Sequence, residues 1–190
     1  MSLAVPLSRF TSRVGGVSAF FVRRMSKRIG SIYSVEVDGD RVRYFWDVGT
    51  DHSQLGSALI VVFRRSYPKS AAPDFDEIVS DDVDFYCHAT VLVGKKMGRW
   101  SKVGFRPVTR TFPMLFRDSD DYGNPKVRVS ERWYVWEPNQ PFRVVGQLTG
   151  DLTKAEIGVV LNPDSIVSRI RTGVYDMFYP AYERGHEPYA

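Results

Sequence analysis

The sequence lacks several features that would place it in a well-defined class of protein. Cys87 is the only cysteine among 190 residues, so an intrachain disulfide is excluded, and a reducing cytoplasm is compatible with this usage. The longest apolar runs, such as Val17–Val22 and Ala58–Phe63, are far shorter than the roughly 20 residues of a membrane-spanning helix. No glycine-rich phosphate loop, Ser-His-Asp set or pair of catalytic carboxylates is recognisable. We therefore expect no catalytic residues, no cofactor and no membrane partner.

Acidic residues are absent from the first 35 positions, and the first acidic residue of the chain is Glu36. The same stretch holds six cations, Arg9, Arg13, Arg23, Arg24, Lys27 and Arg28. The whole chain has 26 Lys+Arg against 22 Asp+Glu, a formal charge of +4. Without those six cations, 20 remain against 22 anions, a formal charge of −2. The excess positive charge lies in residues 1–35, and the weakly acidic body, residues 36–190, does not predict nucleic acid as a partner.

The leader, residues 1–24, is open to three interpretations. Met25 could start the chain and run directly into the first strand, which would make residues 1–24 a basic extension, disordered or non-native, outside the domain. Alternatively, its arginines and apolar residues form a basic amphipathic stretch of transit-peptide type. The third interpretation is an arm that binds a partner. We expect one domain over residues 25–180 and a loose tail over residues 181–190.

Alternation of apolar and polar residues predicts that strands dominate this domain. Residues 29–37 and 41–48 alternate and are joined by Asp38-Gly39-Asp40, which predicts a β-hairpin. A late helix is predicted from Asn162 as N-cap and Pro163 to Gly173, and a short one from Asp74 to Val79. The result is a single α+β domain of mainly antiparallel strands with one short helix near the C-terminus. The other expected strands are 83–93, 114–117, 127–136, 142–148 and 157–161, with a basic loop over 94–98. The apolar run over 59–65 is expected to form a buried strand or a helix turn.

The histidines and the cysteine do not predict a reactive or metal-binding site. His52, His88 and His186 have no metal-ligand spacing between any pair, so no metal site is expected. Cys87 and His88 are neighbours on one predicted strand, and their side chains must therefore point to opposite faces. We expect a core thiol at Cys87 and a sheet-face imidazole at His88.

Two acidic clusters are the main candidates for a contact surface. Residues 118–124 carry Asp and Gly at positions one, three and six of a calcium loop, but Tyr122 and Val129 occupy positions five and twelve, which predicts a polar turn. Together with a second cluster, they could meet a basic partner. The second cluster consists of Asp74, Asp76, Glu77, Asp81, Asp82 and Asp84. Trp133, Tyr134 and Trp136 place rings on both faces of one strand, so one ring is expected to face outward. The candidate contact residues are Asp81, Asp82, Asp84, Asp118, Asp120, Asp121 and Trp136.

A basic patch is the remaining polar feature. Lys95, Lys96, Arg99 and Lys102 surround Trp100, which is typical of nucleic-acid binding when it recurs over a surface. A single loop of this kind in a net-negative body does not predict that function.

Seven segments of the sequence carry a resemblance to a known family: Lys27–Tyr33, Asp51–Ser57, Val83–His88, Gly94–Trp100, Leu115–Asp118, Trp133–Trp136 and Arg169–Gly173. Together they resemble bacterial immunity proteins of polymorphic-toxin systems, in the family numbered twenty-six. The resemblance covers about residues 27–180. It implies a cytoplasmic, non-enzymatic protein that binds and neutralises a cognate toxin domain. A β-rich interaction module unrelated to toxins, with residues 1–24 as a targeting segment, and a small enzyme with an unsignalled active site stay as alternatives.

Overall fold

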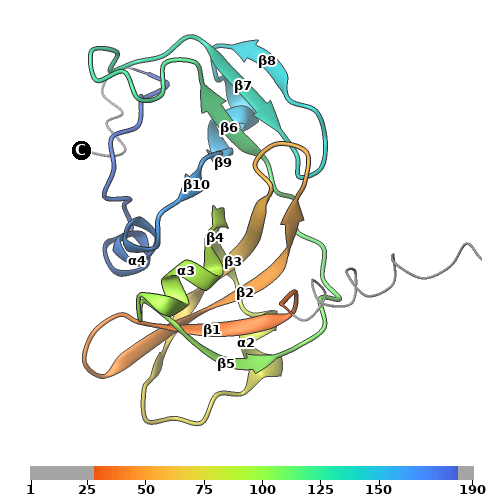
Figure 1. The fold of residues 1–190 in the computed structure, drawn as a ribbon, viewed down its shortest axis with the longest axis vertical. Coiled ribbons are helices and arrows are strands. Elements are labelled where there is room, and N and C mark those ends of the chain that lie inside the picture. The colour runs from red at the N-terminus through yellow and green to blue at the C-terminus, as the bar shows by residue number, and fades with distance from the viewer. Residues whose placement is uncertain (1–27, 184–190) are drawn as a thin grey trace, which may run out of the picture.

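The computed structural model describes residues 28–183, which form two β-sheets packed end to end (Figure 1). The six-stranded sheet has the order β10-β4-β3-β2-β1-β5, and the four-stranded sheet has the order β8-β7-β6-β9. An α+β domain dominated by antiparallel pairs is thereby confirmed. The strands of the six-stranded sheet are β1 Ser31–Glu36, β2 Arg41–Asp51, β3 Ser57–Pro68, β4 Val83–Ala89, β5 Ser101–Phe105 and β10 Val160–Leu161. Those of the four-stranded sheet are β6 Phe116–Ser119, β7 Trp133–Trp136, β8 Arg143–Gly146 and β9 Glu156–Ile157.

The predicted hairpin is confirmed in β1 and β2, which pair antiparallel from Ile32 opposite Trp46 to Glu36 opposite Val42. Its turn is held locally, because Oδ1 of Asp38 accepts hydrogen bonds from the backbone N–H groups of Asp40 and Arg41. Such short-range bonding by an aspartate is the reason this residue type favours turns.

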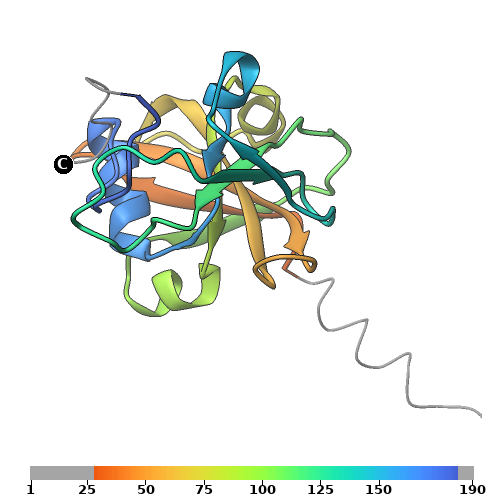
Figure 2. The same cartoon turned by 90° about the horizontal axis from the view of Figure 1, so that it is seen from above.

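The predicted strand over residues 83–93 is too long, because β4 ends at Ala89 and helix α3, Val91–Lys96, follows it. The carbonyl of Thr90 accepts from the N–H groups of Val93 and Gly94, which closes a helical turn in place of a strand ladder. The expected basic loop over 94–98 therefore belongs largely to α3. This helix projects from the body of the fold (Figure 2).

The predicted strand over residues 127–136 is wrong in its first half, since only Trp133–Trp136 forms β7. The backbone of the preceding segment bonds to Ala181, which accepts from Ser130 N–H and donates to the carbonyl of Arg128. Ala181, at the start of the expected loose tail, is therefore buried. Residues 184–190 lie outside the described residues, as does the leader.

The expected strand over residues 157–161 is divided between the two sheets. β9 pairs parallel with β6, whereas β10 pairs parallel with β4. Gly158 lies between them with its Cα against the ring of Trp136, since a Cβ there would come within 2.1 Å of the indole. This short crossing links the sheets covalently.

The predicted late helix is confirmed as α4, Pro163–Thr172, with Oδ1 of Asn162 accepting from Asp164 and Ser165 N–H and Gly173 ending it at φ 85°. The short helix predicted after Asp74 is α2, Phe75–Ser80, capped by the Asp74 carboxylate. A 3-10 turn, η1 (Gly150–Lys154), precedes β9. Within the described residues, no helix has the length and apolar content to span a bilayer.

Both faces of the six-stranded sheet are buried, which divides the core into two clusters. One contains Phe45, Cys87 and, from α4, Ile166, and receives Trp133 from β7. The other contains Trp46 and Val61 and receives Phe116 and Trp136. The four-stranded sheet thus lies across the end of the larger sheet and contributes one face to each cluster.

Candidate binding cleft

One face of the four-stranded sheet is covered at one end and open at the other. At the covered end, Phe116 of β6 is opposite Trp136 of β7, and both are buried. Two residues along, Asp118 of β6, Tyr134 of β7 and Val144 of β8 form a row across three strands. Residues opposite one another in neighbouring strands share a face. The open end is therefore built from one carboxylate, one phenol and one aliphatic side chain.

This row forms the floor of a cleft of about 660 Å³. The turn between β2 and β3 contributes Gln54 and Leu55, and the turn's own position is fixed by hydrogen bonds from Ser53 and Gln54 side chains to the carbonyl of Gln140. The cleft therefore lies where the two sheets meet, between a hairpin end of one and the open face of the other.

The charged residues of the cleft are predominantly acidic. Asp118, Asp120 and Glu131 line it together with one cation, Arg132, which leaves a net formal charge of −2. The Arg132 guanidinium lies 2.9 Å from the Asp120 carboxylate, and both side chains are more than half exposed. An exposed pair of this kind contributes little to stability and can be rearranged by an incoming charge. We conclude that the cleft attracts cationic groups.

Asp118 is held in place by two tyrosines. Tyr134 Oη donates to its Oδ2 at 3.1 Å, and Tyr179 Oη donates to its Oδ1 at 2.9 Å. Burial raises the pKa of Asp118. The hydrogen bonds from Ser119 N–H, Tyr179 and Tyr134 lower this pKa and so partly offset the effect of burial. Burial and the neighbouring Asp118 raise the pKa of Tyr134 to about 12. Tyr134 therefore stays protonated at neutral pH and serves as a fixed hydrogen-bond donor.

Aromatic and aliphatic side chains form the apolar part of the cleft. The ring of Tyr134 lies 5.1 Å from that of Phe142 and 6.0 Å from that of Trp136. Phe142 is 52% exposed and Val144 is 76% exposed, so both offer apolar surface on the rim of the cleft. Apolar anchors next to charged groups are the composition of protein–protein contact sites.

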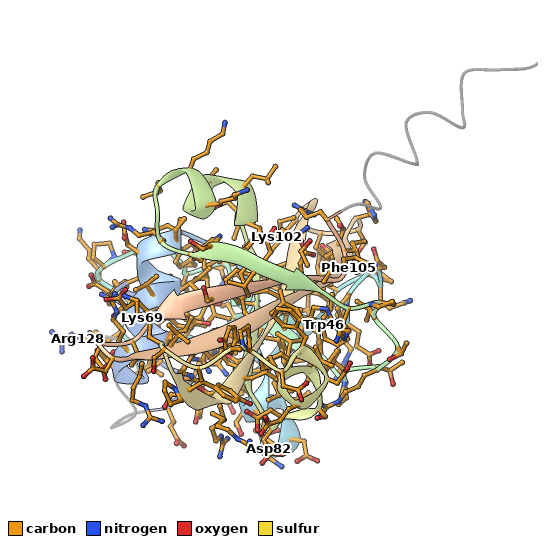
Figure 3. The ribbon with its side chains drawn as sticks, turned by 90° about the horizontal axis from the view of Figure 1, so that it is seen from below. Trp46, Lys69, Asp82, Lys102, Phe105 and Arg128 are labelled. Carbon is orange, nitrogen blue, oxygen red and sulfur yellow. The ribbon has the colours of Figure 1, made fainter. Side chains whose placement is uncertain are left out.

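The candidate residues from the sequence do not converge on one site. Asp118, Asp120 and Trp136 line the cleft, whereas Asp81, Asp82 and Asp84 do not. Asp81 and Asp82 lie between α2 and β4, and Asp84 lies at the start of β4. Asp82 is at the periphery of the molecule (Figure 3).

Much of the second acidic cluster is used inside the fold. Asp84 accepts a hydrogen bond of 2.6 Å from Arg43, whose guanidinium also donates to the carbonyls of Phe63 and Ile170. Asp81 accepts from the backbone N–H of Arg65 and its side chain is 9% exposed. In the other cluster, Asp121 is used similarly, since it accepts from Ser130 Oγ at 2.7 Å. Among the acidic candidate contact residues, Asp82 and Asp120 are the two that are exposed.

Trp136 is 4% exposed, so its indole forms the back wall of the cleft and offers little contact area. Its Nε1 donates at 3.0 Å to Oδ2 of Asp51, and Nε2 of His88 lies 3.0 Å from the same oxygen. The other Asp51 oxygen accepts from Ser53 and Asn139 N–H groups. These donors outweigh burial and lower the pKa of Asp51 to about 2.

Sequence reasoning missed this Asp51–His88–Trp136 cluster, because its members come from β2, β4 and β7 and no local spacing connects them. His88 is fully buried as well as placed on a sheet face, and burial lowers its pKa, so the imidazole is neutral. His52 is exposed, as expected. His186 lies outside the described residues.

The expectation for Cys87 is confirmed, since its thiol is fully buried among core residues while His88 contacts Phe116 on the opposite face. Burial raises the thiol pKa, which disfavours the nucleophilic thiolate. Over residues 28–183, no group of three or more His, Cys, Asp or Glu side chains is arranged to hold a metal ion.

The basic patch lacks the aromatic platform that a nucleic acid would stack on. Trp100 is 3% exposed, its Nε1 donates to the carbonyl of Val91, and its ring meets Phe45 edge-on. Arg99 is paired with Asp164 at the start of α4. The remaining cations of the patch are surface charges of α3 and β5.

Comparison with known proteins identifies no relative, since no family model, no curated protein and no solved structure matches this chain.

Proposed function

We propose that this protein binds a basic toxin domain and neutralises it in the cytoplasm of the cell that makes both, as an immunity protein does. The sequence resemblance suggests this class of function. The observation that carries the proposal is the open cleft at the junction of the sheets, with its net formal charge of −2 and its exposed Phe142 and Val144.

The cleft supports binding by two distinct physical effects. Its carboxylates favour the approach of a positively charged surface, which is what a domain that acts on an anionic substrate such as nucleic acid presents. Phe142 and Val144 then offer apolar area that loses water on contact. A volume of about 660 Å³ holds only a few side chains of a partner, so the cleft would be the centre of a larger interface.

Co-expression with the toxin encoded beside this gene tests the proposal. The unaltered protein should rescue growth, and a complex should form between the purified partners. The double variant Asp120→Lys, Glu131→Lys reverses two exposed cleft charges and should weaken binding by at least about 1 kcal/mol, which is roughly fivefold in Kd.

The matched control is Asp82→Lys, which reverses an exposed aspartate outside the cleft and should bind as tightly as the unaltered protein. Cell death in the presence of the unaltered protein, with no complex detected, would rule out the proposed function. Weakening by Asp82→Lys alone would place the interface on the α2–β4 side.

A further inference from the structure

The outermost strand of the four-stranded sheet, β8, is an exposed edge. β7 is its one neighbour in the sheet order, and no other strand within residues 28–183 pairs with it. An edge strand presents N–H and C=O groups that can pair with another chain. Within residues 28–183, no segment covers the side chain of Val144 on β8, which is 76% exposed.

The cleft begins directly beside this edge. Val144 is opposite Tyr134, and Tyr134 is opposite Asp118, so the cleft floor runs from β8 inward across the sheet. A chain added at the edge would lie about 4.8 Å from β8, and its alternate side chains would share the face of Val144. Those side chains would enter the cleft from its open side.

A gap in the edge gives such side chains access to negative charge. Gly146 ends β8 with φ 70° and carries no side chain, and its Cβ position is 3.7 Å from the backbone oxygen of Glu131. Glu131 and Asp120 are both exposed cleft residues. The Glu131 carboxylate accepts a hydrogen bond of 3.3 Å from Gln147, and Asp120 is paired with Arg132. Both contacts are exposed, so a cationic side chain of the added strand can compete for these carboxylates, whereas an acidic one would be repelled.

We propose that β8 takes up an extended, basic segment of the partner as an additional antiparallel or parallel strand. Backbone hydrogen bonds to β8 hold the segment, an apolar residue packs on Val144 and Phe142, and a neighbouring Lys or Arg pairs with Glu131 or Asp120. This inference rests on the proposed function for the partner's identity. Its chemistry, a cationic strand, follows from the edge and the cleft alone.

A synthetic nine-residue peptide alternating lysine and valine serves as the probe, with an alternating glutamate–valine peptide as the control. NMR titration of the full chain should shift the amide signals of Arg143–Gly146 with the lysine peptide and leave them unmoved with the glutamate peptide. Equal binding of both peptides, binding without shifts in β8, or absence of binding would each overturn strand addition.

Val144→Lys places a cation on the edge at an exposed position and should weaken peptide binding at least about tenfold. Val103→Lys is its matched control, because Val103 is an exposed valine on β5, the edge strand of the other sheet. Unchanged binding by Val144→Lys, or loss with Val103→Lys alone, would contradict the inference. So would a dimer that Val144→Lys converts to a monomer, since a second copy would then occupy the edge.

The same variant separates this inference from the proposed function. If Val144→Lys still neutralises the toxin as well as the unaltered protein does, strand addition is wrong and the proposed function stands. If the lysine peptide binds β8 but the toxin is not neutralised by any variant, the edge site stands and the proposed function is wrong.

Discussion

Two buried aspartates on one strand illustrate how local donors decide the state of a carboxylate. Asp47 and Asp51 both lie in β2 and both are fully buried. Asp51 receives hydrogen bonds from Trp136, Ser53 and Asn139, and its pKa falls to about 2. Burial raises the pKa of Asp47 to about 6 despite an ion pair with Arg28 at 3.0 Å. Identical residues four positions apart therefore have opposite effects on stability as the pH changes.

We expect Asp47 to make the protein less stable as the pH rises from about 4 to about 6. Its folded-state pKa is raised, so the folded protein holds a proton that the unfolded chain has already lost, and stability falls across that window. The loss contributed by this one group is about 3 kcal/mol. Asp47→Asn should remove this slope, so urea unfolding at a series of pH values should show the difference from the unaltered protein changing between pH 4 and 7. A constant difference would show that Asp47 does not titrate there.

At the scale of elements, the segment after β4 shows a tertiary contact overriding a strand pattern. Residues 83–93 alternate throughout, yet α3 begins at Val91. The indole of Trp100 packs on Gly94 and bonds to the carbonyl of Val91, which stabilises the helical turn. A glycine is required at 94 because any Cβ would lie 2.0 Å from the Trp100 ring.

Gly94→Ala should therefore destabilise the protein, although alanine is the better helix former. Overpacking against Trp100 costs about 1 to 3 kcal/mol, more than the gain of up to about 1 kcal/mol from helix propensity. Gly49→Ala is the control, because a Cβ there meets only Leu59 at an ordinary 3.8 Å. Chemical unfolding of both variants checks the difference. A Gly94→Ala protein as stable as the Gly49→Ala protein would contradict the packing argument.

At the scale of the whole molecule, the two sheets are joined by a short covalent crossing and by buried side chains. β9 and β10 carry the chain from one sheet to the other. Asp51 of the larger sheet accepts from Trp136 of the smaller one and from Asn139 in the loop after it. Because the cleft is formed between the sheets, this junction also sets the cleft's shape.

Trp136→Phe should cost about 1.5 to 3 kcal/mol, since it removes a hydrogen bond to a buried charge. Trp133→Phe is matched in strand, burial and size, but the hydrogen bond that it removes goes to the neutral carbonyl of Ser130. Loss of that bond should cost about 0.5 to 1.5 kcal/mol, in addition to the effect of the smaller buried area. The cost of Trp136→Phe should shrink as the pH falls from about 4 toward 2, because Asp51 then becomes protonated and the stability from its lowered pKa is lost. Thermal unfolding at pH 7 and pH 2.5 measures both effects, and equal costs at the two pH values would be inconsistent with this role.

Local patterns in the sequence were sufficient to predict those features whose stabilising contacts join residues close together in the chain. The hairpin at Asp38, the caps at Asp74 and Asn162 and the stop at Gly173 all depend on hydrogen bonds or backbone angles within a few residues. The α+β class and the burial of Cys87 follow from the same short-range periodicity.

Only the tertiary structure decided which acidic and aromatic residues form a site. Asp118 and Asp120 reach the cleft because β6 ends at its floor. Asp84 instead accepts a hydrogen bond from Arg43, and the buried Trp136 donates its hydrogen bond to Asp51. The exposed β8 edge and the Asp51–His88 pair likewise depend on residues distant in the chain, and local spacing carries no signal for them. The sequence by itself determines that this domain is rich in strands, through alternation, and that residues 36–190 are weakly acidic, through composition. Long-range packing determines where that charge is available.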